Sequence, residues 1–166
     1  MAKLRILLFP DKRLKTVATP VKTIDETILQ HLDDMLETMR LANGVGLAST
    51  QVGIPWRLVV IDSEDGNNPL FLINPEILHL AEPTESEEGC LSFPGVYVKV
   101  KRFNQAQVQY LDRHGTPQVL SAEGLLSICL QHEIEHLDGI THYDHLSPMK
   151  QSFVRSKMNK YLRTSL

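Results

Sequence analysis

Apolar positions recur at helical spacing early in the chain. Residues 25–42 carry leucine, isoleucine and methionine three and four positions apart, which predicts an amphipathic helix. Thr23 and Glu26 form a capping-box pattern at its start, and Asn43 followed by Gly44 supplies a stop signal. We therefore expect a helix with one face in the core.

Two further helices are expected later in the chain. Residues 124–137 are apolar on most sides and are followed by Gly139, which indicates a central, buried helix. Ser147 and Pro148 read as an N-cap followed by proline at the first helical position. This third helix should run to about Leu162.

Strand-like runs lie between the first two helices. They cover residues 58–62, 70–80 and 96–111, and a turn at 112–115 leads into 117–122, which predicts a hairpin. Strands grouped in this way favour an α+β fold over an alternating α/β fold. We expect antiparallel β-sheets packed around the central helix, with one helix N-terminal and one C-terminal to them.

One compositional anomaly interrupts this pattern. Residues 81–89, with the sequence AEPTESEEG, contain four glutamates. Such a run is typical of a solvated surface loop, and a loop held by a rigid scaffold often carries function.

Composition narrows the class of protein. The 166 residues are 42% apolar and 22% charged, which is ordinary for one globular domain spanning 1–166. A net charge of -3 argues against a broad nucleic-acid-binding surface. No apolar run approaches the ~20 residues of a membrane span, and the N-terminal apolar run is too short for a signal peptide. We expect a cytoplasmic protein whose two cysteines, Cys90 and Cys129, are reduced.

The expected central helix carries His132, Glu133 and His136 in an H-E-x-x-H pattern. Residues four apart share one helix face, so the two imidazoles can bind one metal ion, and the glutamate can act as general base toward a bound water. A catalytic site of this kind has three protein ligands. The third is either His142, which completes the metzincin peptidase pattern, or Cys90, a strong ligand as thiolate.

Two further motifs decide between these ligands. Residues 44–51 read GVGLASTQ, residues 88–92 read EGCLS, and residues 132–136 read HEIEH. These three motifs, in this order, resemble those of the peptide deformylase family, and the resemblance extends over nearly the whole chain. Three ordered motifs are far more specific than one, and the complete motif around Cys90 favours it over His142.

The resemblance implies a function and a set of roles. Family members hydrolyse the N-formyl group from the formylmethionine of newly made polypeptides and release formate. The metal ligands would be Cys90, His132 and His136, with hydroxide in the fourth position attacking the formyl carbon. Glu133 would act as general base and then acid, and the Gln51 side-chain amide and the Leu91 N–H would stabilise the oxyanion.

The same resemblance implies how the peptide binds. The nascent chain would lie as an added strand along the glycine-rich stretch, and its methionine side chain would enter an apolar pocket. The implied substrate-binding residues are Gly44, Val45, Gly46, Glu88, Gly89, Leu125, Ile128 and Cys129. For Leu125 and Ile128, ordinary core packing is the competing interpretation.

Metal identity does not follow from the ligands, because a thiolate and two imidazoles suit zinc, iron, cobalt or nickel. The resemblance implies Fe2+ in the cell, with Zn2+, Ni2+ or Co2+ as other occupants. Two further hypotheses stay open at this point. One is a metzincin-like peptidase that uses His132, His136 and His142, and the other is a non-catalytic module with a closed metal site.

Two positions depart from the family pattern. Ser49 stands where the first motif usually has its second alanine, and its hydroxyl needs a partner if it is buried. Glu135 replaces the usual aspartate between the histidines and is longer by one methylene. We expect its partner to be a group that orients a metal ligand.

The last predicted helix is basic, with no acidic residue after Asp144. A solvated helix face is the plain interpretation. The resemblance implies a second one, docking on the ribosome through this helix. From composition and charge we expect no membrane partner and no specific nucleic-acid partner. The basic residues are Lys150, Arg155, Lys157, Lys160 and Arg163.

Overall fold

The computed structural model describes residues 2–62 and 68–165. Its strands form one antiparallel five-stranded sheet in the order β1-β2-β3-β4-β5. Three helices and three short 3-10 turns complete the fold, and no helix within the described residues is long and apolar enough to cross a membrane. The helices are α1 (Glu26–Leu41), α2 (Gly124–Leu137) and α3 (Pro148–Thr164), the strands are β1 (Gly46–Ala48), β2 (Leu58–Ile61), β3 (Leu70–Glu88), β4 (Val98–Leu111) and β5 (Pro117–Glu123), and the turns are η1 (Lys12–Lys15), η2 (Ser49–Val52) and η3 (His142–His145).

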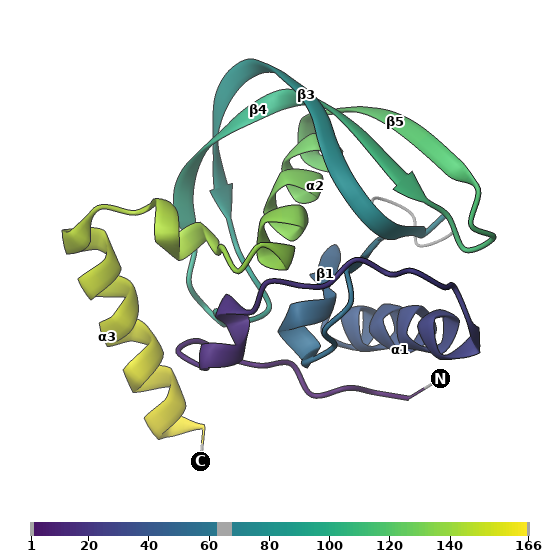
Figure 1. Ribbon diagram of the computed structural model, residues 1–166. Helices are drawn as coiled ribbons and strands as arrows, with labels where there is room; N and C mark the ends of the chain where they lie inside the picture. The colour runs from purple at the N-terminus through teal and green to yellow at the C-terminus, as the bar shows by residue number, and fades with distance from the viewer. Residues whose placement is uncertain (1, 63–67, 166) are drawn as a thin grey trace.

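Helix α2 occupies the centre of the molecule. Figure 1 shows β3, β4 and β5 curving around it, with α1 packed below and α3 at one edge. Strand β2 is buried on both faces, because its side chains alternate between two cores. Leu58 and Val60 pack in the core that includes α1, whereas Val59 and Ile61 pack in the core that includes α2. The expected α+β fold with a central helix is confirmed.

The expected start of α1 is wrong in one detail. The N-cap is Asp25, whose side chain accepts a hydrogen bond from the Ile28 N–H at 3.0 Å. The capping-box pattern of Thr23 and Glu26 lies too early, because an Asx residue nearer the first turn takes this role. The stop signal is confirmed, with Asn43 in the left-handed region at φ 56°.

The acidic segment 81–89 is not a surface loop. Strand β3 continues through it to Glu88 and pairs with β4, so that Glu85 lies opposite Lys101 and Glu87 opposite Lys99. Cross-strand pairs of opposite charge stabilise a sheet face. The long β3–β4 ribbon carries the residues after Glu88 to the side of α2.

Helix α3 buries two apolar side chains against the rest of the protein. Val154 and Met158 pack in a core with Phe93, from the segment that follows β3, and with Val98, at the start of β4. Its N-cap is Ser147, whose side chain accepts from the Lys150 N–H, as the sequence predicts. The five basic side chains of α3 are exposed.

Candidate active site

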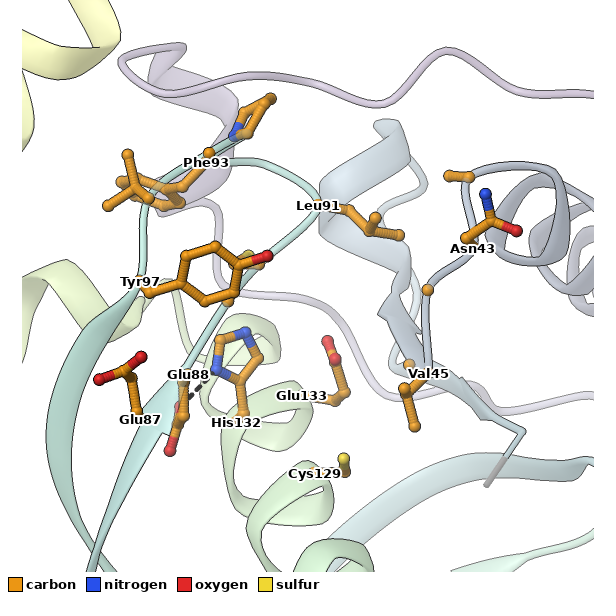
Figure 2. Close-up of a pocket in the computed structure, with 18 of the residues that line it drawn as sticks. Asn43, Val45, Glu87, Glu88, Leu91, Phe93, Tyr97, Cys129, His132 and Glu133 are labelled. Atoms are coloured by element: carbon orange, nitrogen blue, oxygen red, sulfur yellow. Dashed lines mark hydrogen bonds and ion pairs between the residues drawn. The ribbon is translucent and has the colours of Figure 1, made fainter. Parts of the chain in front are cut away.

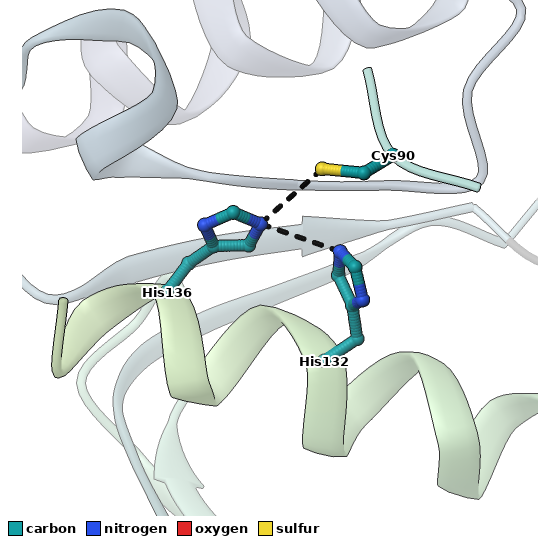
Figure 3. A group of neighbouring side chains, drawn as sticks. All are labelled: Cys90, His132 and His136. Carbon is teal, nitrogen blue, oxygen red and sulfur yellow. Dashed lines mark hydrogen bonds between the residues drawn. The ribbon is translucent and has the colours of Figure 1, made fainter. Parts of the chain in front are cut away.

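Three side chains with metal-binding atoms converge where α2 meets the segment after β3 (Figure 3). The Cys90 Sγ lies 3.4 Å from the His136 Nε2, which in turn lies 3.3 Å from the His132 Nε2. All three donor atoms lie within 4.8 Å of one another. The two histidines stand one turn apart on α2, as the H-E-x-x-H spacing predicts, and Cys90 reaches them from a distant part of the chain.

The spacing of these atoms fits one tetrahedral metal ion. Metal–nitrogen bonds of about 2.0–2.1 Å and a metal–sulfur bond of about 2.3 Å would separate two nitrogens by about 3.4 Å and nitrogen from sulfur by about 3.6 Å. The observed separations are 3.3 and 3.4 Å. Burial lowers the pKa of His136 well below its usual value, which favours the neutral imidazole that a ligand must be. The donor set therefore suits a divalent metal of intermediate softness.

His132 is held from behind by a carboxylate. Its Nδ1 lies 2.8 Å from Glu88 Oε1, which leaves Nε2 on the side of the other donors. Arg102 donates two hydrogen bonds to the same carboxylate, from Nε at 2.7 Å and from Nη2 at 2.9 Å. Burial alone would raise the pKa of Glu88, but the hydrogen bonds from Arg102 and His132 outweigh it and hold that pKa far below its usual range.

Arg102 also contacts Glu135, the residue that departs from the family pattern. Its Nη1 donates to the Glu135 carboxylate, which lies against the His145 ring as well. Arg102 and His145 were not predicted from the sequence, because neither belongs to a spaced motif. The one signal for Arg102 is a third basic residue in the predicted strand, directly after Lys99 and Lys101.

Glu133 is a buried carboxyl group on the wall of the site. Within the described residues its Oε1 has no hydrogen-bond partner. Burial raises its pKa to about 7, with a further contribution from the negative charge of Glu88. A side chain at Gly46 would place its Cβ 2.7 Å from Glu133 Oε2, so strand β1 passes directly against this carboxyl. A carboxyl group with a free oxygen and a near-neutral pKa is suited to proton transfer.

Gln51 is buried in the short turn η2 beside the three donors. Its Oε1 accepts from the Ala48 N–H at 2.9 Å, which fixes the orientation of the amide. Its Nε2 then lies 3.1 Å from Ser92 Oγ and 3.6 Å from Cys90 Sγ. The amide N–H group therefore faces the site.

A pocket of about 690 Å³ opens in front of these groups (Figure 2). Among the residues predicted from sequence, Gln51 and His136 lie outside its lining. Other lining residues were not predicted from the sequence, and they include Asn43, Glu87, Phe93, Tyr97 and Tyr161. The predicted residues that line it are Gly44, Val45, Gly46, Glu88, Gly89, Cys90, Leu91, Leu125, Ile128, Cys129, His132 and Glu133.

Helix α2 contributes one part of the apolar wall of the pocket, through Leu125, Ile128 and Cys129. Leu125 is 56% exposed, so it is not a core residue, and Ile128 is half-buried. Burial raises the pKa of Cys129 to about 12, which keeps its thiol protonated and apolar in character. These three side chains and Val45 form a surface on which an unbranched apolar side chain can pack.

His142 is close to the site but is not one of the converging donors. It is buried against Phe93 and His132, with ring centroids 4.7 and 5.5 Å away. Neither of its ring nitrogens has a partner among the described residues. Burial lowers its pKa to about 3, so the ring is neutral. The set that includes His142 as third ligand is not favoured.

Ser49 meets the expectation for a buried hydroxyl. It is fully buried, and its Oγ donates to the Trp56 carbonyl oxygen and lies 3.4 Å from the Leu58 N–H. The substitution of alanine by serine is therefore accommodated by backbone groups.

Fold and site together define a class: a hydrolase that joins an H-E-x-x-H helix to a cysteine from a distant segment. The family model for polypeptide deformylase matches residues 3–152. Peptide deformylases of Cellvibrio japonicus and Azotobacter vinelandii are 52% and 50% identical to this chain, and the alignments cover 96% and 98% of both proteins respectively. The chain belongs to the peptide deformylase family.

Solved structures agree with this assignment. A peptide deformylase from Legionella pneumophila superposes with a TM-score of 0.96 at 45% identity, covering 99% of this chain and 98% of that one. One from Ehrlichia chaffeensis, in complex with actinonin, gives a TM-score of 0.93 at 38% identity, covering 97% and 98%. The protein is thus a metal-dependent hydrolase that removes the formyl group from N-formylmethionine of new polypeptides.

Proposed function

We propose that this chain carries out deformylation with Cys90, His132 and His136 holding one divalent metal ion and Glu133 moving the proton. The observation that carries the proposal is the unbonded Glu133 oxygen, buried beside three converging donor atoms. When bound, the metal would lower the pKa of a water molecule and polarise the formyl oxygen. Fe2+ is the metal we expect in the cell, and the donor set also accepts Zn2+, Ni2+ and Co2+.

In this proposal Glu133 first accepts a proton and then donates it. It takes the proton from the attacking water and delivers it to the amine nitrogen as the carbon–nitrogen bond breaks, so that formate and a free methionyl amine leave. Its pKa of about 7, raised by burial, matches this exchange near neutral pH. Gln51 Nε2 and the Leu91 N–H would donate to the formyl oxygen as it gains negative charge, each worth ~2.7–4 kcal/mol.

The peptide would bind as a strand along Gly44, Val45 and Gly46, with Gly89 on the opposite wall. A Cβ at Gly44 would lie 2.6 Å from Leu91 Cδ1, and one at Gly89 would lie 2.9 Å from Tyr97 Cε1, so a side chain at either position would displace a residue that lines the pocket. Main-chain hydrogen bonds would tolerate varied sequences after the methionine. The methionine side chain would pack on Leu125, Ile128, Cys129 and Val45, which line the pocket as Glu88 does.

The test is formate release from a short N-formylmethionyl peptide. Protein prepared without oxygen is loaded separately with Fe2+, Ni2+ or Zn2+, and metal content is measured for each sample. We expect release with wild-type protein and its loss in Glu133→Ala with metal content retained. Absence of release by fully loaded protein would refute the proposal.

A second pair of variants separates the two ligand sets. Cys90→Ser should abolish metal retention and activity, whereas His142→Phe should retain both. The opposite result would restore the metzincin-like arrangement.

We further propose that residues 1–166 act as one catalytic domain in the cytoplasm, where formylated chains are made, and that α3 docks on the ribosome. The support for docking is the exposed basic face of α3, which would attract ribosomal RNA. Cosedimentation with ribosomes should weaken with salt and with Lys157→Glu. Binding that is indifferent to both would contradict it.

A further inference from the structure

Glu135 is bonded on two sides, although it does not line the pocket. On one side it accepts a hydrogen bond from Arg102 Nη1. On the other, the Nε2 of His145 lies 2.8 and 3.0 Å from its two oxygens. His145 comes from η3, in the connection between α2 and α3, and no motif of the sequence includes it.

Arg102 is the link between Glu135 and the metal-binding atoms. Its side chain is only 3% exposed, so each of its N–H groups needs an acceptor. Two of its nitrogens hold Glu88, which in turn holds the Nδ1 of His132. The side chains thus form one continuous chain of charge-assisted hydrogen bonds, from His145 through Glu135, Arg102 and Glu88 to His132.

Glu135 is longer than the aspartate of the family motif, so the contact with His145 is needed to hold its carboxylate in place. Glutamate has one more rotatable bond than the aspartate usual at this position of the family motif, so its carboxylate has more rotamers to lose. With Arg102 as the only partner, the carboxylate would be held at one point. The two contacts to His145 fix it at a second point, at the solvent edge, where its side chain is 23% exposed.

We propose that His145 is a positioning residue, which fixes Glu135 so that Arg102 and Glu88 keep the His132 ring aimed at the other donors. The inference rests on the proposed function, because it takes His132 to be a metal ligand. His145 does not touch the substrate or the metal site itself. Its effect reaches them only through the other three side chains.

The test uses Co2+-loaded protein and two readouts that do not depend on activity. The visible absorption spectrum reports the geometry of the ligands, and transfer of Co2+ to a chelator reports the rate of metal loss. Removal of a group that directly holds a metal ligand typically costs 10–100-fold in metal affinity. Because His145 acts from further away, we expect His145→Ala to accelerate metal loss ~3–10-fold and to shift the absorption spectrum. His145→Gln keeps a donor and should restore most of both. His114→Ala, at an exposed turn, should match wild type.

A double-mutant cycle separates positioning from a simple tie between η3 and α2. If His145 acts through Glu135, then His145→Ala should have no further effect on metal loss once Glu135→Ala is present. Additive effects of the two substitutions on metal loss would overturn this inference and leave the proposed function intact. The same holds if His145→Ala lowers the melting temperature but changes neither the spectrum nor the rate of metal loss. Failure of wild-type protein to hold Co2+ would overturn the proposed metal site and this inference together.

Discussion

Replacing Arg102 by methionine tests the buried ion pair behind His132. Methionine keeps most of the aliphatic stem and removes only the guanidinium group. The Glu88 carboxylate, whose side chain is 6% exposed, then loses two hydrogen bonds and its counter-charge. The hydroxyl of Ser86 at 2.7 Å and the ring of His132 are its remaining partners.

The magnitude follows from this burial. Breaking a buried ion pair by removing one partner costs roughly 3–5 kcal/mol, because the other charge stays uncompensated. For a chain of this size, 1 kcal/mol shifts the melting temperature by about 2–4 °C. Arg102→Met should therefore lower the melting temperature by roughly 6–20 °C. Arg13→Met is the matched control, since Arg13 also pairs with a carboxylate but its side chain is 62% exposed, and little change is expected.

Thermal unfolding should be followed by circular dichroism and calorimetry in the presence of a chelator. The metal must be absent because a ligand that binds only the folded state adds its own stabilisation. If Arg102→Met unfolds within about 2 °C of wild type, the loss is at most about 1 kcal/mol and the expected cost of about 3–5 kcal/mol is refuted. The Glu88 carboxylate would then not depend on Arg102 for its place in the interior.

Three other expectations follow from single contacts. Gly46→Ala should lower kcat/KM for formate release about 100-fold with metal content unchanged, because the added Cβ would lie 2.7 Å from Glu133 Oε2. Unchanged kcat/KM would show that the Glu133 carboxyl moves aside freely. With a pKa of about 12, only about one Cys129 thiol in ten thousand is ionised at pH 8. Mass spectrometry of metal-free protein treated with iodoacetamide should therefore find the label on Cys90 and not on Cys129, and equal labelling would contradict this. Asp25→Ala should cost about 1 kcal/mol in thermal unfolding and Thr23→Ala much less, whereas the reverse order would reinstate the capping box.

The fold was readable where local pattern and local structure coincide. Helix α2 occupies the predicted residues, because its apolar periodicity and its terminal glycine act within one segment. The second half of β3 was not readable in this way. Glu85 and Glu87 lie opposite Lys101 and Lys99, so the pairing that makes this segment a strand comes from residues further along the chain. A window over 81–89 alone contains only the acidic half of that pattern.

The candidate site divides along the same line. The three converging donors and Glu133 belong to motifs whose spacing encodes their geometry, and the structure brings Cys90, His132 and His136 together. Arg102 and His145 have no such spacing. Their positions are set by the tertiary packing of β4 and η3 against α2, so their contacts with Glu135 cannot be predicted from sequence spacing.

Strand β1 is one of the two edges of the sheet, since among the described strands only β2 pairs with it. An unpaired edge is a template on which a second molecule can add its own sheet and start an aggregate. Here the edge is three residues long, preceded by the left-handed turn at Asn43 and followed by the turn η2. An edge this short offers an added strand few main-chain hydrogen bonds, so β1 is a poor template for sheet-to-sheet aggregation.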